Sequence, residues 1–136
     1  MSIYADTDEF YAATRALFTR IEQEDPHAGD AILSSHLVMR LRSTAPDAEI
    51  TINGRRRPIQ ITYGTDSVRP TLDIELSADL LHRILLGERS MKQALANGQL
   101  KVSGPVWKAT ALEDLFRQSQ SLYPEILREQ NLHSGD

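Results

Sequence analysis

Two acidic residues on one predicted strand are the first candidates for acid–base chemistry. Asp73 and Glu75 alternate with apolar residues in the run TLDIEL, so both carboxylates lie on the same face of that strand. Paired carboxylates can share the acid and base steps of a reaction when their pKa values differ. Nothing nearby in the sequence would raise either pKa, and carboxylates on the polar face of a strand are normally solvated. We therefore expect no catalysis at this pair.

The four histidines do not form a metal-binding or catalytic pattern. His27, His36, His82 and His133 fall in a loop, a strand, a helix and the C-terminal residues, without metal-ligand spacing. His82 follows a leucine pair on its helix, and we expect it at the surface or at the boundary of the core. The absence of cysteine excludes disulfides, thiol catalysis and thiolate metal sites. We expect no catalytic residue, no metal and no cofactor.

Three consecutive arginines, Arg55, Arg56 and Arg57, are the strongest charge feature of the sequence. They follow Asn53-Gly54, a pair typical of tight turns between two strands. The turn is either a solvated hairpin tip or a contact for an anionic surface or headgroup. A net charge of -4 argues against a dedicated nucleic-acid binder, so no nucleic-acid partner is expected.

Hydrophobic spacing predicts the elements that position these residues. A capping-box pattern at Asp6 and Glu9 begins a helix that extends to Glu24. Shorter helices follow Ser77 and Ser90, and a long last helix begins at Gly104-Pro105. Alternation with a period of two predicts five strands, in residues 36–42, 48–53, 58–63, 71–76 and 99–103.

Nearly every predicted strand is apolar on one face only, which is typical of a mainly antiparallel sheet that helices cover on one side. The 136 residues fit a single domain, with a core of about 7–123 and a C-terminal tail at 124–136. No segment is apolar enough to span a bilayer, and the start MSIYADTDEF lacks the features of a secretion signal. A cytoplasmic location is expected.

The stretch LDIELSADLLHRILLGERSMKQALANGQLKVSG, residues 72–104, is the most informative part of the sequence. It combines a strand, a Ser-led helix, Gly87, a second short helix and a strand with alternating Leu100 and Val102 between two glycines. This order and spacing resemble the sterol carrier protein 2 (SCP2) domain family, and the resemblance covers roughly residues 10–122. The chain ends in HSGD, without a peroxisomal tripeptide, and has twelve arginines to three lysines. Both features suggest a bacterial stand-alone member whose ligand need not be a sterol.

The resemblance implies an α+β fold in which helices overlie a five-stranded sheet, with an apolar tunnel between the two layers. The implied partner is an elongated hydrophobic molecule, such as a fatty acid, an acyl chain, or a sterol-like or polyketide-like compound. Strand faces and family positions predict tunnel walls from the sheet, walls from the short helices and a lid from the last helix. These residues are Met39, Leu41, Ile59, Ile61 and Tyr63 of the sheet, Leu81, Leu85, Met91 and Leu95 of the short helices, and Trp107, Leu112 and Phe116 of the lid.

Three functions remain open at this stage. The first is lipid binding or transfer without chemistry. The second is an enzyme or accessory protein that acts on a hydrophobic biosynthetic intermediate, which Tyr63, His36 or Arg40 would polarise. The third is an interaction module that docks on a protein or an anionic membrane through the outer sheet face or the three arginines. Residues 124–136 would cover the tunnel mouth, contact a second subunit in a homodimer, or fray.

Overall fold

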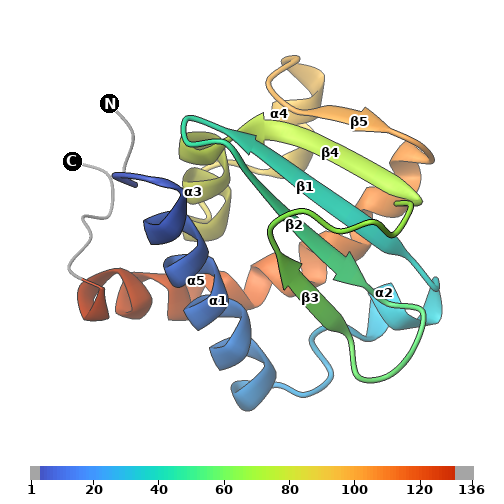
Figure 1. Cartoon of the computed structure of the whole chain (residues 1–136), viewed down its shortest axis with the longest axis horizontal. Helices are drawn as coiled ribbons and strands as arrows, with labels where there is room; N and C mark the ends of the chain where they lie inside the picture. Colours follow the sequence, from blue (N-terminus) through green and yellow to red (C-terminus); the bar gives the residue numbers. More distant parts are fainter. Residues whose placement is uncertain (1–3, 131–136) are drawn as a thin grey trace.

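The computed structural model describes residues 4–130, without the side chains of Thr110 and Asp114. Within this part of the chain, five strands form one sheet in the order β3-β2-β1-β4-β5, and helices lie behind it (Figure 1). The strands are β1 Val38–Thr44, β2 Ala48–Asn53, β3 Gln60–Tyr63, β4 Leu72–Ser77 and β5 Lys101–Ser103.

Strand β1 lies at the centre of the sheet and sets its apolar face. It pairs antiparallel with β2 and parallel with β4, while the β2–β3 and β4–β5 pairs are antiparallel. Met39 lies opposite Ile52 of β2 and Leu72 of β4, and all three side chains are fully buried. The predicted α+β class and the mainly antiparallel sheet are therefore confirmed.

The helical layer is organised around the last helix. The described helices are α1 Thr7–Glu24, α2 Asp30–Ser34, α3 Ala78–Leu86, α4 Met91–Ala96, the 3-10 helix η1 Val106–Thr110 and α5 Ala111–Glu129. Helices α1, α2 and α3 all contact α5, which crosses behind the sheet in Figure 1. Of the helices within residues 4–130, none combines the length and the apolar character needed to cross a bilayer.

Helix α1 has the bounds that its capping pattern predicts. The Asp6 carboxylate accepts a hydrogen bond from the Glu9 amide at 2.8 Å, and the Glu9 side chain accepts one from the Ala5 amide at 3.2 Å. The apolar face of α1 is fully buried through Phe10 and Leu17, among others. The helix is therefore fixed both by its own N-terminus and by its packing on the core.

Helix α5 extends further than the sequence predicts. Residues 124–129, assigned above to a tail, belong to this helix, and Ile126 and Leu127 are buried. The predicted start of the tail is thus wrong, because this apolar pair continues the buried stripe of the helix. His133 lies outside the described residues. The short helix α2 was not predicted either, since its five residues are too few to show a period.

His82 is also placed differently from the prediction. It is only 4% exposed, on the side of α3 that faces the core. Its Nδ1 atom lies 2.8 Å from the Tyr123 hydroxyl of α5, which is also hydrogen-bonded to the Tyr4 hydroxyl. Burial raises the pKa of both tyrosines. A partner on a distant helix, invisible in the local pattern, allows this histidine to be buried.

Candidate ligand-binding site

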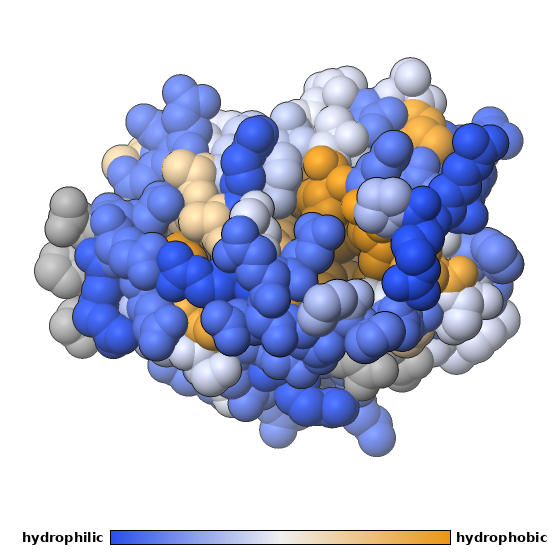
Figure 2. All heavy atoms as spheres, turned by 90° about the horizontal axis from the view of Figure 1, so that it is seen from below, coloured by the Kyte–Doolittle hydropathy of each residue, from blue (hydrophilic) through white to orange (hydrophobic). Residues whose placement is uncertain are grey.

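A cavity of about 230 Å³ lies at the end of the sheet where β2 and β3 pair. Its walls come from both layers of the fold and are mostly apolar. They include Phe18 and Ile21 of α1, Leu33 of α2, Ile52 of β2, Ile59 next to β3, and Leu115 of α5. Figure 2, which shows the molecule from below, displays a hollowed hydrophobic area surrounded by hydrophilic side chains.

Part of the cavity wall comes from the chain between α1 and the sheet, which carries small side chains there. Helix α2 has five residues, and the preceding segment contributes Ala28 and Gly29 to the cavity wall. The Ile59 side chain lies where a β-carbon on Gly29 would be, well inside contact distance. Glycine at position 29 therefore provides the space that Ile59 occupies.

A second close approach holds the same two segments together. A β-carbon on Gly54 would lie 2.9 Å from the Ile32 carbonyl oxygen and 3.0 Å from that of Leu37. The Gly54 amide donates a hydrogen bond of 2.7 Å to the Leu37 carbonyl. We define the β2–β3 turn as residues 54–59. Its first residue is therefore packed directly on α2 and the residues that follow it.

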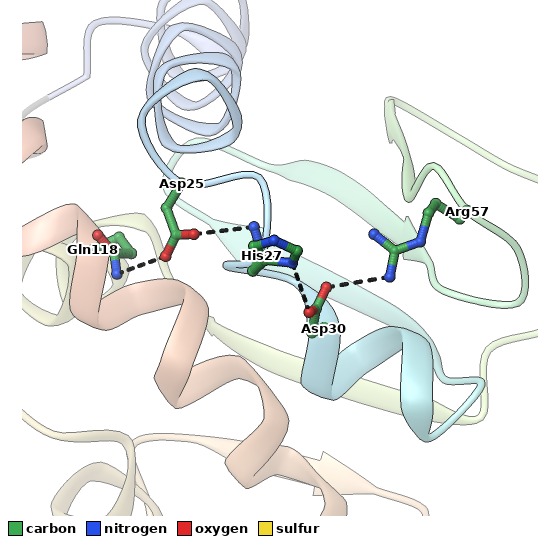
Figure 3. A network of polar contacts seen from close by, with 5 residues as sticks. All are labelled: Asp25, His27, Asp30, Arg57 and Gln118. Carbon is green, nitrogen blue, oxygen red and sulfur yellow. Dashed lines mark hydrogen bonds and ion pairs between the residues drawn. The ribbon is translucent and has the colours of Figure 1, made fainter.

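Polar side chains at the rim of the cavity form a network of hydrogen bonds and ion pairs (Figure 3). Asp25 accepts a hydrogen bond from the His27 amide at 3.0 Å and another from the Gln118 side chain of α5 at 3.2 Å. Asp30 lies 3.0 Å from His27 Nδ1 and 3.4 Å from a guanidinium nitrogen of Arg57. Asp25 and Arg57 also line the cavity, so this network joins α5, α2 and the β2–β3 turn around its mouth.

The ion pair between Arg57 and Asp30 is a weak connection. The two side chains are 64% and 46% exposed, and the 3.4 Å distance is at the long end of hydrogen bonding. Exposed pairs of this kind contribute from zero to about 1 kcal/mol of stability because water and salt screen them. The polar rim can therefore rearrange at little energetic cost.

Two of the twelve predicted wall residues, Ile59 and Ile61, line this cavity, and Arg57 of the predicted arginine contact lines it as well. Met39, Leu41, Leu81, Leu85 and Leu112 are buried in the core and are not among the lining residues. Met91 and Phe116 line a separate recess of about 300 Å³, which also has several charged side chains. Leu95 is partly buried against the core, away from both.

None of the three predicted lid residues is among the residues that line this cavity. Trp107 is 73% exposed on η1 and does not line the cavity, because the buried stripe of this region begins only at Ala109. Leu112 and Phe116, the other two lid residues, are buried in the core. Tyr63 packs against the ring of Tyr11, and burial raises its pKa to about 12.

The other candidates for chemistry lie away from the cavity. On the outer sheet face, Asp73 accepts a hydrogen bond of 2.9 Å from Arg42, and Glu75 lies 3.8 Å from the same guanidinium. The Arg40 guanidinium donates to the carbonyl oxygens of Asp66 and Val68 in the loop after β3. Within residues 4–130, no group of three or more His, Asp or Glu residues is arranged to hold a metal ion.

Sequence reasoning missed most of the cavity wall. The helical spacing of residues 7–24 predicts that Phe18 and Ile21 lie on or beside an apolar stripe, but it links neither these two residues nor Leu33 and Leu115 to a cavity. The available signal was the segment DPHAGD, residues 25–30, where small residues separate two runs of larger apolar ones. That composition indicates a loop, but it does not indicate which atoms lie opposite.

Comparison with known proteins places this geometry in a family. The model of the SCP-2 sterol transfer family matches residues 18–117. Similar solved structures include the sterol carrier protein domain 2 of Helicoverpa armigera, with 18% identity and a TM-score of 0.62 over 79% of this chain and 84% of that one. Sterol carrier protein 2 from Yarrowia lipolytica, in its apo form, has 21% identity and a TM-score of 0.57 over 76% and 88%.

A third similar structure is palmitated SCP2L2 from Aedes aegypti, with 12% identity and a TM-score of 0.53 over 78% of this chain and 92% of that one. No curated protein sequence matches the chain. The structural likenesses show a shared fold, and the family model covers most of the residues that build the sheet and the cavity. The chain therefore belongs to the SCP-2 sterol transfer family, whose general function is lipid binding or transfer.

Proposed function

We propose that this protein binds and transfers a lipid, or another elongated hydrophobic molecule, by taking its apolar chain into the cavity beside β2 and β3. One observation carries the proposal. The cavity has a mostly apolar wall, opens through a polar rim, and lies in a member of a lipid-transfer family. An apolar chain enclosed by Ile21, Ile52 and Leu115 is removed from water, which is the main source of binding free energy for such a ligand.

The size of the cavity limits what it encloses. A volume of about 230 Å³ has room for roughly seven groups of the size of a water molecule, each with a share of about 30 Å³. Seven methylenes would contribute about 6 kcal/mol before the costs of ordering the ligand. Pockets for small molecules usually measure roughly 300–1,000 Å³. A long ligand therefore leaves part of its length outside, or the cavity widens when it binds.

Single acyl chains are the ligand class that this size favours. The Aedes aegypti domain, which has the same fold, is described as palmitated. A sterol-like ring system is bulkier than a single acyl chain, so less of it fits in a cavity of about 230 Å³. We therefore place fatty acids and other single-chain lipids first among the ligands to test.

Binding without chemistry is favoured over catalysis. None of Tyr63, His36 and Arg40, the residues that would polarise a bound intermediate, is among the residues lining the cavity. His36 is exposed, and the Arg40 side chain bonds the loop after β3. The polar groups that do line the cavity, Glu22, Asp25 and Arg57, belong to its rim. They are positioned to contact the polar end of a ligand.

The proposal is tested by blocking the cavity. Ile61→Trp places a large ring in the cavity wall, and Val102→Trp makes the same change at a partly buried site on β5 outside the cavity. We expect Ile61→Trp to weaken the binding of a fluorescent fatty acid at least about tenfold, because the ring occupies space worth several methylenes. Val102→Trp should bind like the wild type. Native mass spectrometry of gently purified protein, with extraction of bound lipids, identifies the natural ligand.

Two results would contradict this assignment. One is a wild-type protein that binds no fatty acid or single-chain lipid and carries none after purification. The other is an Ile61→Trp variant that is folded by circular dichroism and binds the probe as tightly as the wild type does.

A further inference from the structure

The β2–β3 turn, residues 54–59, both lines the cavity and carries exposed positive charge. Its last residues, Arg57, Pro58 and Ile59, line the mouth of the cavity. Its first arginines, Arg55 and Arg56, are exposed beside them. Within residues 4–130, neither Arg55 nor Arg56 forms an ion pair. A concentration of unneutralised positive charge therefore lies next to the entrance of the cavity.

Two contacts hold the end of this turn in its observed position. The Ile59 side chain occupies the space above Gly29. Arg57 is paired with Asp30, the residue that follows Gly29 in the sequence. Figure 3 shows Arg57 reaching from the turn towards Asp30 at the start of α2. We call these two contacts the latch. Because the ion pair is exposed, its loss changes the equilibrium between the latched and the released turn by no more than about fivefold.

The opposite side of the mouth carries negative charge. Glu22 and Asp25 line the cavity from the end of α1 and the residues after it, and Asp30 lies beside them at the start of α2. A negatively charged surface would attract the β2–β3 turn and repel this acidic side. The two sides of the mouth therefore respond to such a surface in opposite directions, which pulls Arg57 away from Asp30.

We propose that the β2–β3 turn docks on an anionic lipid membrane and that docking releases the latch, so that a lipid can enter or leave the cavity. This inference rests on the proposed carrier function. Membrane phosphates replace Asp30 as the partner of Arg57, and Ile59 then moves off Gly29. Each arginine near an anionic membrane contributes a factor of about five to association. Since the chain as a whole has a net charge of -4, the turn also orients the molecule with its cavity facing the membrane.

A transfer experiment tests both parts of the inference. A fluorescent fatty acid is loaded into vesicles of phosphatidylcholine, or of phosphatidylcholine mixed with phosphatidylglycerol, and its uptake by the protein is followed in time. Wild-type protein should take up the probe faster from the anionic vesicles. The double variant Arg55→Glu, Arg56→Glu leaves the latch intact. Its rate of uptake from the anionic vesicles should be lower than that of the wild type by a factor of about ten or more, so that the acceleration is lost. Its uptake from neutral vesicles should not change.

Two further variants address the latch itself. Asp30→Asn keeps the shape of the side chain and removes the charge that holds Arg57, so uptake from neutral vesicles should become about two to five times faster. Gly29→Ala displaces Ile59 and should act in the same direction. Arg83→Gln removes an exposed arginine from α3, a helix that contributes no residue to the cavity wall, and should behave like the wild type.

The possible failures are distinguishable. An Arg55→Glu, Arg56→Glu variant that keeps the full acceleration overturns the docking surface. Wild-type uptake rates for both Asp30→Asn and Gly29→Ala from neutral vesicles overturn the latch. Wild-type protein that does not bind the free probe in solution, without any vesicle, overturns the proposed carrier function instead.

Discussion

The two ends of the sheet are covered by helices of different size, and the mostly apolar cavity beside Ile59 lies at one of them. Against β4, helix α3 has nine residues and contacts α5; its Leu81 and Leu85 are fully buried, as is Leu112 of α5. Next to the start of the β2–β3 turn, helix α2 has five residues and buries only Ile32 completely. At the first end, which we call the closed end, these buried leucines fill the interior, and the charged recess lined by Met91 and Phe116 lies between α3, α4 and α5. The second, which we call the open end, contains the apolar cavity.

The polar networks of the two ends differ in how far they are buried. The closed end contains the cluster of Tyr4, Tyr123 and His82, which is buried. The open end has the exposed pairs of Asp30 with His27 and Arg57. A buried hydrogen bond is strong and costly to lose, whereas an exposed ion pair is screened by water. The comparison teaches that stability is concentrated at one end and freedom to move at the other.

Truncation of a core leucine should show the largest contrast between the ends. Leu85→Ala removes a fully buried side chain from the closed end and should lower the free energy of unfolding by about 2–5 kcal/mol. Ile61→Ala, in the wall of an existing cavity and only partly buried, should cost less than half as much. Urea denaturation followed by circular dichroism measures both values. Equal losses at the two positions would show that the open end is packed as tightly as the closed end.

Removal of one hydroxyl should show the next largest effect. Tyr123→Phe takes a hydrogen-bonding oxygen away from Tyr4 and His82 in the interior, which should cost about 1–3 kcal/mol. Asp30→Asn, which breaks the exposed network, should change the free energy of unfolding much less. The same denaturation experiment compares the two variants. If Asp30→Asn proves the more destabilising, the exposed network is a structural support and not a movable rim.

Acid should have the smallest of these effects on stability. It acts on the contact between α1 and α5, where Arg20 pairs with Glu129. A hydrogen bond from Arg20 lowers the pKa of the Glu129 carboxyl below its ordinary value of 4.5. The ionised form is therefore favoured in the folded state, so the stabilisation is complete above the ordinary pKa and is lost as the pH falls through the lowered one. Melting temperatures measured across this acidic range should fall slightly less for Glu129→Gln than for the wild type. Parallel curves would mean that the pair contributes nothing measurable.

Much of the fold was predictable because its signals are local. The capping residues Asp6 and Glu9 and the apolar period predicted α1 with its observed bounds. Alternation located all five described strands to within about two residues, since one face of each strand is buried. The parallel pairing of β1 with β4 was not predicted from the residues, because it depends on how the chain crosses behind the sheet.

The candidate site was predicted only in part, for a physical reason. Apolar spacing shows which side chains face the interior, and two of the predicted wall residues, Ile59 and Ile61, line the cavity. A cavity also depends on the side chains that stand opposite, here the small residues Ala28 and Gly29 of its wall, and apolar spacing does not reveal them. Leu85 and Leu112 have the same inward pattern, but they meet other large side chains and fill their space.

The exposed position of Trp107 has a consequence for optical studies of this protein. It is the only tryptophan in the sequence, and its ring is largely in water on the 3-10 helix before α5. It is not among the residues that line the cavity, so a bound acyl chain would leave its surroundings nearly unchanged. The intrinsic emission spectrum should therefore be that of a hydrated indole in both the empty and the loaded protein. Occupancy has to be read from a label on the ligand.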